Sequence, residues 1–135
     1  MGVATTYNPG DMVKPSTYVA VSPAQRAGSL AEAQALDYLR SRGLRPIAAN
    51  VRLRCGEIDL IMADGDQCVF VEVRRRSSRR YGGAAASVTP RKQARLRAAA
   101  QAWLAWRMGA LAWPPMRFDV VAFEGDALIW LPGAF

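Results

Sequence analysis

Histidine is absent from this chain, and only two of its 18 basic residues are lysines. Without imidazole, and with cysteine at only two positions, Cys55 and Cys68, a bound metal would depend on oxygen ligands. Carboxylate oxygens suit hard cations such as Mg²⁺ or Mn²⁺. Any metal chemistry is therefore expected to use aspartate and glutamate.

Long apolar runs are missing as well. No stretch approaches the ~18 apolar residues of a membrane span, and the N-terminus lacks the basic and apolar regions of a secretory signal. Cys55 and Cys68 are expected about 26 Å apart along the sheet, too far for a disulfide. Reduced thiols fit the cytoplasm, so we expect a cytoplasmic protein without a membrane partner.

The 135 residues, 51% hydrophobic and 21% charged, fit one soluble globular domain. Residues 1–21 are rich in glycine, proline, serine and threonine and show no sustained hydrophobic period. They are expected to form a flexible N-terminal tail. The folded domain is expected to span residues 22–135.

Two helices are predicted from their end signals. Ser22-Pro23 begins one that runs to about Arg42 and stops at Gly43, and Thr89-Pro90 begins another that ends near Met108. The β-rich segments are residues 45–52, 56–62, 69–74, 117–123 and 128–131. The order α-β-β-β-α-β-β indicates an α/β fold, a mixed sheet flanked by two long helices.

The second and third of these strands read as a hairpin. Residues 63–67 are typical turn formers, and a two-residue turn at Asp64-Gly65 would shift the pairing by two residues and keep the same faces. A two-residue turn at Gly65-Asp66 pairs Asp64 with Gln67. In that register Asp59 is expected opposite Glu72. The same face would carry Glu57 opposite Arg74 and Ile61 opposite Phe70, while the other face would carry Ile58, Leu60 and Met62 against Val69, Val71 and Val73.

Directly opposed carboxylates such as Asp59 and Glu72 repel each other, so a fold keeps them for a limited set of reasons. They can share a proton, bind a cation, or lie in solvent where the repulsion costs little. The residues alone leave two interpretations open: a metal site, or an exposed sheet face decorated with charges.

The net charge of +7 is concentrated in one block. Residues 74–97 hold nine basic residues and no acid, and arginine is the side chain that best grips phosphate. Beside a carboxylate cluster, this block favours a polyanion held over a metal, hence phosphodiester chemistry. A solvated arginine-rich surface is the alternative. The expected nucleic-acid contacts are Arg74, Arg76, Arg79, Arg80, Tyr81, Arg91, Lys92 and Arg95.

The element order, with Asp59 followed by Glu72-Val73-Arg74, resembles the PD-(D/E)xK signature of restriction-endonuclease-like proteins, with arginine where lysine is usual. More specifically, the chain resembles the YraN family, uncharacterised bacterial proteins related in fold to archaeal Holliday junction resolvases. The resemblance runs from about residue 25 to the C-terminus. It rests on Glu32, Asn50, residues 56–61, 69–74, Arg76, residues 81–83, Lys92 and residues 117–121.

The resemblance implies a restriction-endonuclease-like core in which Glu32, Asp59 and Glu72 bind Mg²⁺ or Mn²⁺. Asp59, Glu72 and Arg74 would then be catalytic. Arginine stays protonated, so Arg74 cannot act as a base, although it can stabilise charge on a phosphate. The function expected is that of a metal-dependent endonuclease acting on DNA, branched or structured DNA included.

Two other interpretations stay open. One is a non-catalytic nucleic-acid-binding module that retains the nuclease fold, which the arginine at position 74 favours. The other is a small assembly protein whose acidic face is structural. Nucleic acid, DNA in particular, is the expected partner, and the sequence does not decide between a monomer and a homodimer.

Overall fold

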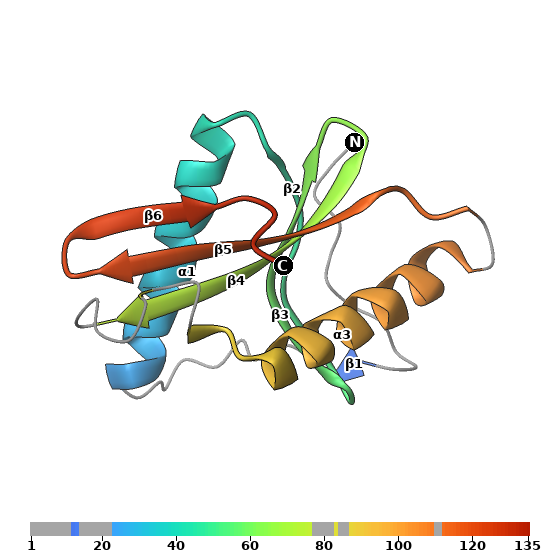
Figure 1. Cartoon of the computed structure of the whole chain (residues 1–135), viewed down its shortest axis with the longest axis horizontal. Coiled ribbons are helices and arrows are strands. Elements are labelled where there is room, and N and C mark those ends of the chain that lie inside the picture. Colours follow the sequence, from blue (N-terminus) through green and yellow to red (C-terminus); the bar gives the residue numbers. More distant parts are fainter. Residues whose placement is uncertain (1–11, 14–22, 77–82, 84–86, 110–111) are drawn as a thin grey trace.

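The chain forms one mixed sheet with two long helices (Figure 1). The computed structural model describes residues 12–13, 23–76, 83, 87–109 and 112–135, with side chains from residue 29 onward except that of Arg76. Its elements are β1 (Met12–Val13), α1 (Pro23–Ser41), β2 (Arg45–Leu53), β3 (Gly56–Asp64), β4 (Gln67–Arg76), α3 (Pro90–Met108), β5 (Met116–Glu124) and β6 (Ala127–Leu131). The strands lie in sequence order, and β4–β5 is the parallel pair.

This arrangement confirms the α/β class, the mixed sheet and the predicted order from α1 onward. It also adds a strand within the segment expected to be a tail. Met12 and Val13 pair with Leu53 and Arg52 at the edge of β2. The rest of residues 1–21 lies outside the described part of the chain.

The helices begin and end where local chemistry predicts. The Thr89 hydroxyl accepts a hydrogen bond from the Lys92 backbone amide at 3.2 Å, and Pro90 occupies the first turn of α3. Gly43, with φ of 95°, follows the end of α1 in the left-handed region that glycine tolerates. The predicted buried stripe of α3 is confirmed as Leu96, Ala99, Ala100, Trp103 and Leu104.

Each helix covers its own hydrophobic cluster. The buried stripe of α3 packs on Ile61 and Phe70 of the sheet. Ala35 and Leu39 of α1 pack with a different set of strand residues that includes Val71. Since Phe70 and Val71 are adjacent on β4 and point to opposite faces, the two helices lie on opposite sides of the sheet.

The hairpin register is confirmed near the turn, where Asp64 pairs with Gln67 and Ile61 with Phe70. The expectation of one continuous apolar face is wrong at Ile58. Leu60 packs in the α1 cluster, whereas Ile58, two residues earlier, packs in the α3 cluster. In a regular strand these two side chains would share a face.

The change of face has a backbone cause next to Asp59. On β2, Ala49 packs with the α1 cluster and Val51 with the α3 cluster, so both strands switch together. Between them lies Asn50 with φ of 53°, a left-handed conformation that asparagine adopts more readily than most residues. This irregularity therefore changes, at the position of Asp59, which face of the sheet the β3 side chains point to.

Two further expectations concern cysteine and membranes. Both cysteines are free thiols, as predicted, with Cys55 exposed and Cys68 buried. Within the described residues, neither helix has the length and apolar character needed to cross a membrane.

Candidate active site

The candidate site lies where β3 and β4 separate, a point that we call the fork and that is visible in Figure 1. Paired residues run from the turn only as far as Leu60 with Val71. Beyond that point the Val73 amide donates to Oδ2 of Asp59 at 2.8 Å. The Asp59 carboxylate thus takes the place of a backbone carbonyl as the acceptor for the Val73 amide. This hydrogen bond holds the Asp59 side chain at the point where the strands diverge.

Three carboxyl groups come together at this point, from three different elements. Glu32 of α1 and Glu72 of β4 both lie close enough to Asp59 of β3 for their charges to disfavour its ionisation. Burial, followed by the charges of Glu72 and Glu32, raises the pKa of Asp59 to about 8. Burial also raises the pKa of Glu32, and Glu57 and Glu72 add to that rise. The sequence-predicted ligands are therefore neighbours, at the expense of mutual repulsion.

Glu72 is the member that meets the basic residues. It is 5% exposed, and its Oε2 lies 3.3 Å from Nη1 of Arg74 and 3.6 Å from Nζ of Lys92. Val71 and Val73 pack on the α1 side, so Glu72 points to the α3 side, where Lys92 lies. The prediction that Glu57, Asp59 and Glu72 share one face of the sheet is therefore wrong, because the acids approach the fork from both sides of the sheet.

Arg74 is held in place by residue 87 as well. Its Nε donates to the Ser87 hydroxyl at 3.3 Å and its Nη2 to the Ser87 carbonyl at 3.0 Å. The expected Glu57–Arg74 pair is wrong: Glu57 pairs across the sheet with Arg52 of β2, at 3.6 Å between Oε1 and Nε. The divergence of β3 from β4 removes Arg74 from the reach of Glu57.

The donor set fits a hard divalent cation by its chemistry. It consists of carboxylate oxygens alone, and a cation would relieve the repulsion that raises the pKa of Asp59. As the described side chains stand, no three acidic, histidine or cysteine residues form a ready cage. Glu72 would have to turn from Arg74 and Lys92 toward Asp59 and Glu32 to complete one.

The structure brings only part of the predicted basic set to the fork. Arg74 and Lys92 contact Glu72, and Arg95 is exposed on α3, as is Arg91. The remaining predicted contacts lie outside the described residues: Arg79, Arg80, Tyr81 and the side chain of Arg76. Ser87 was missed by the sequence reasoning, since a lone serine in a loop carries no signal of its partner.

A second acidic centre was also missed as a unit. Asp119 of β5 is fully buried and accepts from Nε and Nη2 of Arg117, each at 2.9 Å. It also accepts from Trp130 Nε1 at 3.0 Å and from the Gly133 amide at 2.9 Å. Its available signal was Arg and Asp two residues apart on a strand, and so on one face. This fully satisfied carboxylate joins β5 to β6 and to the C-terminal turn.

Comparison with known proteins places these residues in a recognised family. The model of the group described as "Uncharacterised protein family UPF0102" matches residues 31–123. A UPF0102 protein of Klebsiella pneumoniae is 55% identical over 111 residues, covering 82% of this chain and 87% of that protein. The UPF0102 protein YraN of Salmonella arizonae is 55% identical over 111 residues, covering 82% and 85%. A UPF0102 protein of Yersinia pseudotuberculosis is 59% identical over 98 residues, covering 73% and 84%.

Proposed function

The chain belongs to the UPF0102 family, which includes YraN, and on that premise we propose that it is a metal-dependent endonuclease. Its fold would be restriction-endonuclease-like, its cation Mg²⁺ or Mn²⁺, and its substrate DNA, branched or structured DNA included. The family name carries no activity, so the proposal depends on the site itself.

One observation carries the proposal: a buried aspartate at the fork whose pKa is raised to about 8 by burial and by two neighbouring acids. Groups with strongly perturbed pKa values that also have specific charge partners concentrate at functional sites. The neighbours of Asp59 are acids on one side, and beyond Glu72 lie Arg74 and Lys92. Negative charge for a cation, bordered by positive charge for a phosphate, is an arrangement that suits metal-dependent phosphodiester hydrolysis.

Each residue then has a distinct role. Glu32, Asp59 and Glu72 would hold the cation, which when bound supplies Lewis-acid stabilisation of charge at the phosphodiester. Arg74 would donate to a phosphate oxygen from a guanidinium oriented by Ser87. Lys92 is the one lysine after Lys14 in the sequence, and its amine at Glu72 would supply the positive charge that the motif usually places at position 74.

A non-catalytic nucleic-acid-binding module is the second candidate, and the position of Arg74 favours it. Its guanidinium is already engaged by Glu72 and by two atoms of Ser87. A guanidinium stays protonated at neutral pH, so Arg74 can donate to a phosphate oxygen but cannot act as a general base toward water. The module would keep the site for binding and lack efficient chemistry.

Nicking of supercoiled plasmid and of branched DNA in Mn²⁺ distinguishes the two candidates. The wild type is expected to cleave, and Asp59→Asn and Glu72→Gln are expected to abolish cleavage. Arg74→Ala should lower the rate about 10²-fold, the scale seen on removing one transition-state donor. Arg74→Lys is expected to retain or raise it.

The controls assign each outcome. Cleavage that persists in Glu72→Gln comes from a contaminant and counts against the enzyme. If wild type and Arg74→Lys both bind DNA and neither nicks any substrate, the binding module replaces the endonuclease. If neither binds DNA, both candidates are wrong.

A further inference from the structure

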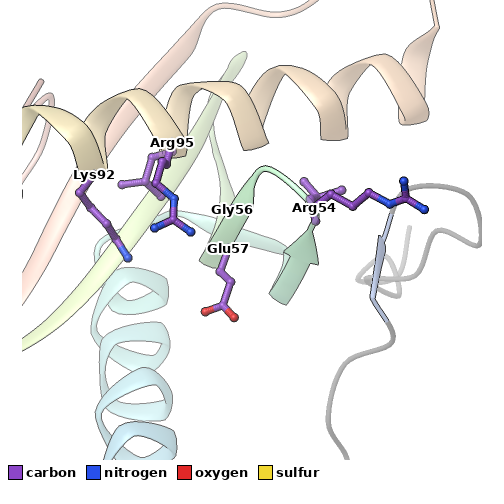
Figure 2. Close-up of a pocket in the computed structure, with 7 residues that line it drawn as sticks. Arg54, Gly56, Glu57, Lys92 and Arg95 are labelled. Carbon is purple, nitrogen blue, oxygen red and sulfur yellow. The ribbon is translucent and has the colours of Figure 1, made fainter.

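A hollow adjoins the candidate active site, between the β2–β3 turn and α3 (Figure 2). Its volume is about 170 Å³, several times the ~30 Å³ that one water occupies in the liquid. Leu53 and Leu96 line it with apolar surface, and Glu57, Lys92 and Arg95 add polar groups. The hollow is therefore large enough for a charged group that keeps part of its hydration.

The charges around the hollow favour an anion. Figure 2 shows the side chains of Lys92 and Arg95 extending from α3 toward the same open side as Glu57, while Arg54 extends away from them. Glu57 is offset by its ion pair with Arg52 at 3.6 Å. Lys92 and Arg95 are one turn apart on α3, whose first turn contains no acidic residue. The two cations can thus bind one ligand group.

Gly56 sets how closely the turn approaches the helix. A Cβ atom built at Gly56 would lie 3.1 Å from the Arg95 carbonyl oxygen, a backbone atom that moves only with the helix. A side chain here would push the turn away from α3. The close contact fixes the backbone of Arg95 against the turn, so its guanidinium starts from a rigid position.

Lys92 connects the hollow to the acidic fork. Its side chain lines the hollow, and its amine lies 3.6 Å from Oε2 of Glu72. A nucleic-acid strand is a chain of regularly spaced phosphates, so a strand with one phosphate at Arg74 would place its next phosphates at adjacent cationic positions. A free phosphate ion would use the hollow without using this continuity.

We propose that this hollow is a binding site for a backbone phosphate of a nucleic-acid strand, with Arg95 and Lys92 as its contacts. The inference rests on the proposed function for the identity of the ligand, because that function makes nucleic acid the source of the phosphate. Binding at the hollow needs neither the cation nor cleavage, so it can be measured separately from both.

The test is a titration of the full-length protein with a thymidine hexanucleotide in EDTA, followed by backbone amide NMR. In the wild type, the amide signals of Gly56 and Arg95 are expected to shift. Arg95→Gln should raise the Kd about tenfold, the effect of losing one hydrogen-bonded charge. Arg95 is exposed, so the variant is expected to fold.

Arg97→Gln is the matched control. It removes the same charge from the same helix, but Arg97 lies over the Phe118 and Phe135 rings, 5.9 and 5.3 Å from their centroids, rather than at the hollow. Its Kd is expected to change little. Equal weakening by Arg95→Gln and Arg97→Gln would mean a diffuse basic surface, and the proposal would be wrong.

Inorganic phosphate forms the second arm. If phosphate shifts the Gly56 signal and the hexanucleotide does not, the site takes a free anion and the proposal is overturned. Plasmid nicking in Mn²⁺ separates this inference from the endonuclease. If Arg95→Gln selectively weakens binding and the wild type does not nick plasmid, the result supports the phosphate site and counts against the endonuclease. If the wild type nicks plasmid and Arg95→Gln binds as the wild type does, the result supports the endonuclease and overturns the phosphate site.

Discussion

Two acidic centres in this sheet are buried in opposite ways. Asp119 has no exposed surface and accepts four hydrogen bonds, two of them from one arginine. Asp59 accepts one backbone hydrogen bond and otherwise faces two more acids, which together with burial raise its pKa to about 8. The first centre has a partner for each oxygen, and the second has unrelieved repulsion.

The difference separates a structural carboxylate, Asp119, from the proposed metal ligand, Asp59. Burying a charge is tolerated when partners compensate for lost hydration, as Arg117, Trp130 and Gly133 do for Asp119. Asp59 has a hydrogen bond from the Val73 amide but no cationic partner among the described side chains, so its burial lowers stability unless a proton or a cation compensates for it. A fold that retains such a cost is expected to use it.

The largest predicted effect is at the structural centre. Arg117→Ala should lower the free energy of unfolding by about 3–5 kcal/mol, because it leaves a buried carboxylate without its main partner. Urea denaturation measures this loss. Asp64→Asn is the control: it removes the more exposed partner of Arg117, which lies 2.8 Å away, and should cost about 0–1 kcal/mol. Similar losses in both variants would show that Asp119 does not depend on Arg117.

The next effect is stabilisation by a cation at the fork. Mn²⁺ or Mg²⁺ at about 100 times its Kd should stabilise the wild type by about 2.7 kcal/mol, by mass action on the folded state. Asp59→Asn should abolish this increase, as read from Tm with and without cation. If millimolar Mn²⁺ leaves the Tm of the wild type unchanged, the carboxylates at the fork are a charged surface and not a metal site. The stabilisation should grow with pH, because the cation displaces the proton on Asp59.

The pH dependence of stability tests the raised pKa directly. The pKa of Asp59 rises from 3.8 to about 8 on folding. Between those values the folded state holds a proton that the unfolded state has lost, so stability falls as pH rises through this window. Asp59→Asn should therefore change stability little at about pH 4 and increase it at about pH 8, by more than about 1.4 kcal/mol. An effect that is equal at both values would contradict the shift.

The smallest effect concerns Glu57, which sequence reasoning paired with Arg74. A double-mutant cycle of Arg52→Ala and Glu57→Ala should give a coupling of about 0.2–1 kcal/mol, since their side chains are 44% and 63% exposed. The matched cycle with Arg74→Ala should give a coupling near zero. Coupling of Glu57 to Arg74 instead would mean that β3 and β4 stay paired beyond Leu60.

The sequence by itself determined the elements from α1 onward and the closeness of Asp59 to Glu72. The Gly65-Asp66 turn and the Thr89 cap are local signals, and each was found where it was predicted. The same signals placed Asp59 close to Glu72, and the family resemblance added Glu32. Local backbone chemistry and side-chain period are written in the sequence, which is why these predictions could be made.

Only the tertiary structure decided how those residues meet. The left-handed backbone at Asn50 switches the faces of two strands, and the divergence of β3 from β4 moves Arg74 from Glu57 to Ser87. Neither the change of face nor the divergence produces a periodic pattern in the sequence, because each depends on how the sheet twists between two helices. The same packing brings Lys92 to Glu72, 20 residues away along the chain. Contacts between distant segments follow from three-dimensional packing, so no local pattern could have predicted them.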